Sequence, residues 1–189
     1  MFSKAQIIAS VCSILDDDNL SGAGELLRRD YPFTPAETVE RKYGDLQALK
    51  VFLRDGFVDR YSGARQVFPG ALRVLALRLP AEFPYHPNWK MTETHLAFWE
   101  LSATIDHKKP IARGGENAED NWVTTSMLRN SAKANWTLEE LGWELKPPGD
   151  VSVWDGLLGW FTRHVGSHPE LRQNARIAAW HRAATLVAG

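Results

Sequence analysis

Residues 104–133 decide the fold, and their sequence is TIDHKKPIARGGENAEDNWVTTSMLRNSAK. A short β-type run, 103–107, ends in charged residues, and a turn containing two adjacent glycines follows it at 110–115. A second β-type run covers 121–125, and residues 126–135 have helix-forming composition. The segment therefore predicts a strand, a loop, a second strand and a helix.

Four polar residues stand at the ends of these elements. Asp106 and His107 end the first strand, Asn121 opens the second, and Asn130 lies in the helix. A hairpin that folds onto a helix can bring Asp106 close to Asn130. Carboxylate and amide oxygens suit a hard cation such as Mg²⁺, which needs few protein ligands when water and phosphate complete its shell. His107 points to the other side of an extended backbone, where it can face an attacking water.

This segment resembles the HNH, or ββα-metal, nuclease family. The resemblance lies in an Asp-His pair at a strand end, a Gly-Gly turn, an Asn 14 residues after the His and a second Asn nine residues further on. Lys133 follows three residues later, as the family pattern expects. The resemblance covers residues 103–135 and extends loosely upstream to about residue 57.

The resemblance implies a metal-dependent endonuclease. Asp106 and Asn130 would bind one Mg²⁺ or Mn²⁺ ion, and His107 would be the general base that deprotonates water. Asn121 would hold His107 in register by bonding the loop. The expected cut leaves 5′-phosphate and 3′-hydroxyl ends. The expected phosphate contacts are basic residues near the site: Lys108, Lys109, Arg113, Arg129 and Lys133.

The chain departs from many members of this family at the zinc knuckle. In those members two Cys-x-x-Cys pairs bind a structural zinc, and the corresponding positions here, 59–62 and 126–129, contain no cysteine. No structural zinc is therefore expected. Flanking helices and nearby aromatic residues must replace it. The aromatic residues in question are Phe57, Tyr61 and Trp122.

Helical periodicity frames the central segment on both sides. The expected helices are 3–15, 20–29, 34–53, 92–101, 136–141, 151–165 and 168–187. Residues 57–79 favour strands or irregular structure, because turn residues separate their short apolar runs. The predicted class is α+β, with a ββα-metal (HNH) motif embedded in N- and C-terminal helices. The predicted regions are 1–56 (helical), 57–145 (nuclease core) and 146–189 (helical), packed as one compact unit.

The only cysteine, Cys12, lies on an apolar stripe with Ile8 and Leu15. A cysteine on such a stripe is more often a buried thiol than a nucleophile. We therefore expect Cys12 to be part of a core.

Composition places few limits on function. Apolar residues make up 44% and charged residues 24% of the 189 residues, as in ordinary globular proteins. No apolar run approaches the roughly 20 residues that span a bilayer, and the N-terminus makes a poor signal peptide, so a cytoplasmic protein without a membrane partner is expected. The net charge of −1 does not by itself favour nucleic acid, although four arginines against one acid after residue 162 are compatible with a basic face.

The predicted function is an endonuclease for double-stranded DNA, of the kind used in restriction or phage defence. A homodimer would supply a second cut, and helices within 151–187 could form its interface. Two alternatives stay open: a catalytically inactive nucleic-acid-binding module on the same fold, and a nuclease for RNA or for single-stranded or structured DNA. The first alternative is disfavoured because all four site positions are filled.

Overall fold

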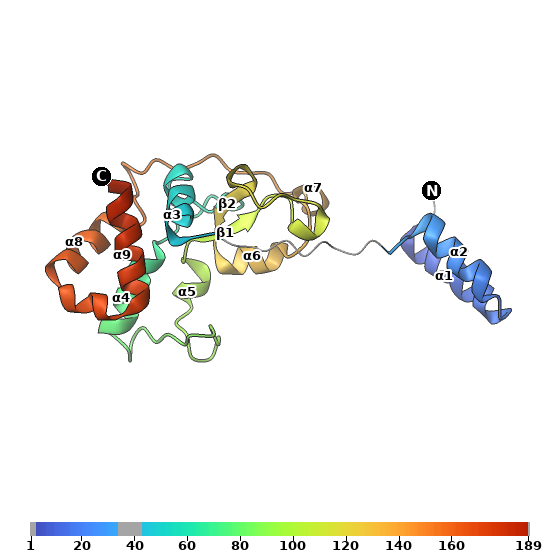
Figure 1. The fold of residues 1–189 in the computed structure, drawn as a ribbon, viewed down its shortest axis with the longest axis horizontal. Helices are drawn as coiled ribbons and strands as arrows, with labels where there is room; N and C mark the ends of the chain where they lie inside the picture. The colour runs from blue at the N-terminus through green and yellow to red at the C-terminus, as the bar shows by residue number, and fades with distance from the viewer. Residues whose placement is uncertain (1–2, 34–42, 189) are drawn as a thin grey trace. The chain divides into compact units, whose positions relative to one another are not determined.

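The computed structural model describes residues 3–33 and 43–188 (Figure 1). Contacts between residues divide the chain into two compact units, 1–37 and 38–189. No boundary predicted from the sequence falls there, so the regions 1–56, 57–145 and 146–189 stay a prediction.

The first unit is a helical hairpin of α1 (Lys4–Asp16) and α2 (Leu20–Asp30). Ser3 caps α1 by accepting from the backbone N–H of Gln6, whose side chain in turn accepts from the Ser3 N–H. Asn19 caps α2. Both predicted helices, 3–15 and 20–29, are confirmed.

The second unit has four main helices around one core. They are α3 (Asp45–Arg54), α4 (Pro69–Arg78), α8 (Leu158–Ser167) and α9 (Ala175–Ala188). Helix α9 packs against α3, α4 and α8, and the 3-10 helix η3 (Pro169–Gln173) joins α8 to α9. Rings of Phe52, Phe68 and Phe161 meet Trp180 or one another at centroid distances of 5.0 to 6.4 Å. Buried aromatic contact of this kind is a large part of what holds the helices together.

A two-stranded sheet lies beside this helical core. Strand β1 (Thr104–His107) pairs antiparallel with β2 (Trp122–Thr125), and His107 stands opposite Trp122. The connection contains two 3-10 turns, η1 (Ile111–Arg113) and η2 (Glu119–Asn121). Helix α6 (Met127–Lys133) follows β2 directly, is capped by Ser126 and contacts β1. The α+β class is therefore confirmed, with the strands and helix in the predicted order.

Two short helices complete the unit. Helix α7 (Leu138–Leu141) has the capping box expected from Thr137 and Glu140. Helix α5 (Ala97–Glu100) begins later than the helix predicted from residue 92.

Other predictions for this unit need correction. Residues 69–78 form helix α4 rather than strand or irregular structure, because Pro69 occupies the first helical position. Gly70 there is a packing residue: a Cβ would lie 2.9 Å from the Phe161 ring. Helix α8 begins at Leu158 rather than 151, because Gly156 and Leu157 have positive φ. Residues 34–42 of the predicted helix 34–53 lie outside the described part of the chain.

Cys12 was expected to be buried and is exposed. Its stripe faces away from α2, since Val11, not Cys12, fills the contact between the two helices. Among the residues that the structure describes, no helix combines the length and apolar character needed to cross a membrane.

Candidate active site

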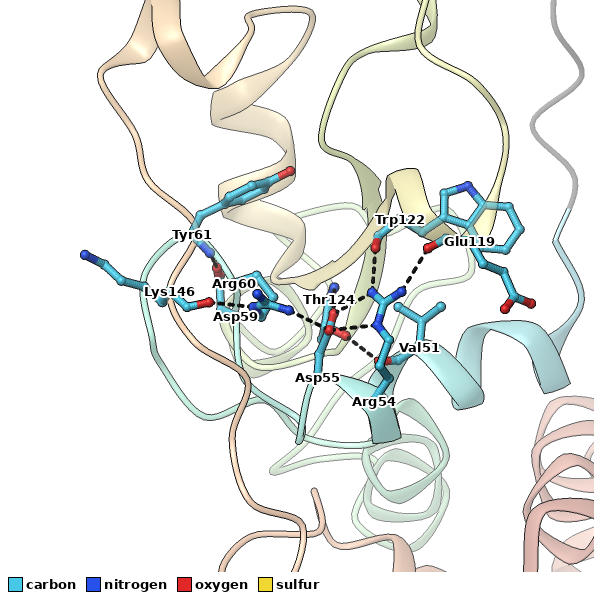
Figure 2. Close-up of polar contacts among 10 residues, drawn as sticks. All are labelled: Val51, Arg54, Asp55, Asp59, Arg60, Tyr61, Glu119, Trp122, Thr124 and Lys146. Atoms are coloured by element: carbon cyan, nitrogen blue, oxygen red, sulfur yellow. Dashed lines mark hydrogen bonds and ion pairs between the residues drawn. The ribbon is translucent and has the colours of Figure 1, made fainter.

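A buried carboxylate at the end of α3 fixes β2 in place (Figure 2). Asp55 is fully buried and its Oδ2 accepts from the backbone N–H of Thr124 at 2.7 Å. Its Oδ1 pairs with Arg60 (2.8 Å) and Arg54 (3.0 Å). Arg54 also donates to the carbonyls of Trp122 and Glu119, at 2.6 and 2.8 Å. The start and the middle of β2 are therefore held by one charged cluster.

At the end of β1, Asp106 is buried between two donors. The Tyr61 hydroxyl donates to Asp106 Oδ2 at 2.7 Å, and the Lys133 Nζ lies 3.0 Å from the same oxygen. Burial, and then the negative charge of Asp106, raise the pKa of the Tyr61 phenol far above its usual range. Tyr61 therefore stays protonated and keeps donating. These contacts fix the carboxylate and engage one of its two oxygens.

His107 is held through its Nε2 atom. This nitrogen lies 2.9 Å from Asn117 Oδ1 and 3.1 Å from Trp122 Nε1, and Trp122 Nε1 also lies 3.1 Å from Asn117 Oδ1. One arrangement satisfies all three groups: His107 Nε2–H and Trp122 Nε1–H both donate to the Asn117 carbonyl, which can accept two hydrogen bonds. We assign this tautomer, in which the lone pair of the imidazole is on Nδ1.

Asn121 ties the β1–β2 connection together. Its Oδ1 accepts from the N–H of Lys109, and its Nδ2 donates to the carbonyls of Lys109 and Glu116. This is the loop-fixing geometry that its proposed role requires. The turn needs both glycines: Gly114 has φ +75°, and a Cβ on Gly115 would meet the Lys109 carbonyl oxygen at 1.9 Å.

Asn130 approaches the same strand end from α6. Its Nδ2 donates to the carbonyl of Ile105 at 3.2 Å, one residue before Asp106. Lys133, one turn further along α6, donates to the carbonyl of His107 at 2.8 Å. Helix α6 thus bonds the backbone on both sides of Asp106, which brings the amide of Asn130 to the end of β1 that carries Asp106 and His107.

The predicted phosphate contacts fall into different settings. Lys133 was predicted to contact phosphate, and this prediction needs correction. Its side chain is fully buried against Asp106 and cannot reach a bound DNA strand. Arg113 is ion-paired with Glu140 at 3.1 Å, and Arg129 lies over the Trp143 ring at 5.2 Å.

The two remaining basic candidates, Lys108 and Lys109, border a shallow hollow of about 360 Å³ beside the Gly-Gly turn. Glu116 and Asp120 line it too, so its formal charges balance. Lys109 is exposed and Lys108 half-buried. Within this hollow, the two lysines are the groups able to contact a phosphate.

The positions that correspond to the zinc knuckle lie together. Asp59 Oδ2 accepts from the Ser126 N–H and the Thr125 hydroxyl, and its Oδ1 accepts from the N–H groups of Tyr61 and Ser62. Asp59 is almost fully buried, as are the three aromatic residues expected to replace the metal: Phe57, Tyr61 and Trp122. A carboxylate therefore links residues 59–62 to the start of α6.

A more enclosed pocket of about 280 Å³ lies elsewhere, where α3, α4 and α9 meet. Phe52, Tyr85 and Trp180 form its aromatic walls, and Arg73 and Arg176 also line it. It includes Thr104 and Ile105 of β1 but neither Asp106 nor His107. We place the candidate site at the strand end because an imidazole, a carboxylate and an amide gather there.

Sequence reasoning missed Asn117, which makes the closest side-chain contact to His107, and gave Tyr61 a packing role only. Asn117 lies in the aperiodic stretch Glu116–Asp120, where no hydrophobic pattern indicates which polar side chain turns inward. The contact between Tyr61 and Asp106 joins residues 45 apart, and no local spacing reveals it.

No family model matches this sequence, and no curated protein or solved structure matches it either.

Proposed function

We propose that this protein is a metal-dependent HNH-type endonuclease that hydrolyses double-stranded DNA. The supporting observation is the gathering of Asp106, His107 and Asn130 at one end of β1, with Asn121 bracing the adjacent loop. A carboxylate, an amide and an imidazole at one strand end are the groups that metal-assisted hydrolysis of a phosphodiester requires.

The imidazole of His107 acts as the general base. With Nε2–H donated to Asn117, the lone pair of Nδ1 takes a proton from water as its oxygen attacks phosphorus. The bond from phosphorus to the 3′-oxygen breaks, and the leaving oxygen takes a proton from solvent. The products carry 5′-phosphate and 3′-hydroxyl ends.

The donor set fits a sparse site for Mg²⁺ or Mn²⁺. Asp106 Oδ1 and Asn130 Oδ1 would hold one ion, whose charge would stabilise the phosphate and the leaving oxygen. Within residues 3–33 and 43–188, no group of three or more His, Cys, Asp or Glu side chains could hold a metal. A site with one carboxylate and one amide forms no such group, so water and substrate phosphate would complete the shell.

The test is cleavage of a supercoiled plasmid and labelled oligonucleotides with Mg²⁺ or Mn²⁺, with and without EDTA. We expect duplex DNA to be cut only with metal, and His107→Ala to lower the rate by about 10²- to 10⁴-fold. His86→Ala, a loop histidine away from the site, is the matched control and should retain activity. Equal cutting by His107→Ala would contradict the proposed base. Preferential cutting of RNA or single-stranded DNA would show that duplex DNA is not the preferred substrate.

A second candidate is a nucleic-acid-binding module without catalysis. The observation that favours it is the double occupation of Asp106 Oδ2 by Tyr61 and Lys133, since a neighbouring ammonium weakens cation binding. Duplex binding in a gel-shift assay, with no cleavage under any metal, would support it.

A further inference from the structure

We propose that the N-terminal hairpin is a homodimerisation module in which two copies pair antiparallel to form a four-helix bundle. The proposal concerns residues 3–33 and does not rest on nuclease activity. It places the interface in a different part of the chain from residues 151–187.

The hairpin is too small to bury a core of its own. Of its described residues, only Val11 and Ala23 are buried apolar side chains. Units of fewer than about 40 residues usually need a disulfide, a metal or oligomerisation, and α1 and α2, at 13 and 11 residues, are near the lower limit for stable isolated helices. We therefore expect the hairpin to be stabilised by packing against another protein surface.

Helix α1 carries two apolar stripes, and only one is used within the hairpin. Ile7, Val11 and Ile14 are buried or half-buried on the side of α2. The second stripe is exposed: Ala5, Ile8, Cys12 and Leu15. Its spacing of three, four and three residues is the a/d spacing by which helices pack in coiled coils.

Helix α2 extends this exposed surface. Leu20 at its start is 77% exposed and Tyr31, just after its end, is 42% exposed. The half-buried Gly24 and Leu27 lie between them, at spacings of four, three and four. Successive residues of a helix are rotated by about 100° around its axis. On α1 the centre of the exposed stripe is therefore rotated by about 110° from the centre of the residues that face α2. On α2 the stripe from Leu20 to Tyr31 is centred about 70° from Ala23, and the rotation has the same direction relative to the N-to-C axis of its helix as on α1. In two antiparallel helices, rotation in the same direction about each N-to-C axis leads to the same side of the pair. The two stripes therefore lie on one side of the hairpin, here called the apolar face.

Charge decides what covers the apolar face. The turn between the helices carries Asp16, Asp17 and Asp18, all exposed. The opposite end carries exposed Lys4, Arg28 and Arg29, of which Arg29 is paired with Asp30 at 2.7 Å. Lys4 lies 5.6 Å from the Tyr31 ring, which places the start of α1 beside the end of α2. In an antiparallel pair the acidic turn of each copy meets the basic end of the other, twice. A second copy of this chain therefore brings an apolar face of its own and complementary charges, three acids at one end against Lys4 and Arg28 at the other.

The C-terminal helices expose less apolar surface for a dimer interface than the hairpin does. Val165, Ile177, Trp180 and Ala184 of α8 and α9 are buried in the core of the second unit. Large exposed apolar side chains after residue 150 are Val151, Val153 and Leu186, too scattered to make a continuous face. The hairpin holds the more continuous unpartnered surface.

The test is the molar mass of the full-length protein by light scattering after size exclusion. We expect twice 21.3 kDa for the wild type, and 21.3 kDa for Ile8→Glu/Leu15→Glu. Ala9→Glu/Ser13→Glu, on the far side of α1, is the matched control and should stay dimeric. Far-UV circular dichroism checks that both variants keep their helices.

A charge exchange tests the antiparallel arrangement without touching the apolar face. Asp16→Lys/Asp17→Lys/Asp18→Lys and Lys4→Glu/Arg28→Glu/Arg29→Glu should each be monomeric at low salt, and an equimolar mixture should recover the dimer mass. A monomeric wild type would overturn the proposal, which is also the result if the hairpin docks on its own second unit. A dimeric Ile8→Glu/Leu15→Glu protein, or a mixture that stays monomeric, would overturn it as well.

Discussion

Asn117 illustrates how the candidate site depends on single hydrogen bonds. Its carbonyl receives both the imidazole N–H of His107 and the indole N–H of Trp122. Without this acceptor, the ring can rotate or exchange its proton to Nδ1, and the lone pair no longer points in one fixed direction. In the proposed mechanism Asn117 is thus a positioning residue, since it would act on the reaction through His107.

We expect Asn117→Leu to lower kcat by about 10- to 100-fold with little change in the KM for duplex DNA, as for other partners that orient a reactive histidine. Asn117→Asp, which keeps an acceptor, should recover most of the rate. Steady-state cleavage of a labelled duplex measures both parameters. If Asn117→Leu raised KM alone, Asn117 would contact DNA rather than position His107.

The positions of the candidate residues along the chain could be predicted from sequence, but their partners could not. Asp106 and Asn130 lie in the strand and the helix that the sequence predicts for them. Asn121, predicted to open the second strand, instead ends η2, one residue before β2. Lys133 shows the limit: its spacing from Asn130 was noted, yet nothing local indicates that a lysine is buried against an acid. Whether a basic side chain faces solvent or a buried carboxylate depends on tertiary packing.

At the scale of elements, β2 is fixed to α3 by charge rather than by a longer sheet. A two-stranded ribbon is only marginally stable alone, so the Asp55 cluster supplies the contacts that further strands would otherwise make (Figure 2). Trp122, at the start of β2, is thereby kept beside His107.

Replacing Asp55 tests this coupling. We expect Asp55→Ala to lower the free energy of unfolding by about 3–5 kcal/mol, because it leaves Arg60 half-buried without its carboxylate. Asp45→Ala is the matched control on the same helix: its ion pair with Arg176 is exposed, and the expected loss is under about 1 kcal/mol. Urea denaturation followed by tryptophan fluorescence compares them. Equal losses would show that the cluster does not hold β2.

The Gly-Gly turn offers a second comparison at this scale. A Cβ at Gly115 meets backbone at 1.9 Å, whereas a Cβ at Gly114 finds only the end of the Lys109 side chain at 3.8 Å and is opposed by φ alone. We therefore expect Gly115→Ala to displace the loop and reduce cleavage by more than tenfold, and Gly114→Ala to cost about 1–2 kcal/mol of stability with most activity kept. Cleavage rates and melting temperatures separate these outcomes. Equal activity of the two variants would show that the conformation of this loop does not affect cleavage.

Elements with a regular period could be predicted, and elements that depend on packing could not. The hairpin helices and the strand–strand–helix order follow from apolar spacing and capping residues. Helix α4 was missed because Phe68-Pro69-Gly70 looks like a turn. It opens a helix because Pro69 suits the first turn and Gly70 admits the Phe161 ring, a contact between residues 91 apart.

For the whole molecule, the two proposals combine into one expectation about products. Each chain has one candidate site, and duplex DNA has two strands, so a dimer can cut both in one encounter. We expect the wild type to convert supercoiled plasmid directly to linear DNA, and the monomeric Ile8→Glu/Leu15→Glu variant to accumulate nicked circles first. Agarose gels over time distinguish the two courses. Identical courses for wild type and variant would uncouple dimerisation from double-strand cleavage.

The central claim is that Asp106 and Asn130 share one divalent cation beside His107. Mn²⁺ binding to the protein with duplex DNA, measured by electron paramagnetic resonance, tests this most directly, with His107→Ala as the background to prevent cleavage. We predict about one Mn²⁺ per chain, a loss of at least about tenfold in affinity when Asp106→Asn is added, and no loss with Asp120→Asn, an acid of the adjacent loop. Undiminished binding by the Asp106→Asn protein, or no Mn²⁺ bound by any of them, would contradict the account.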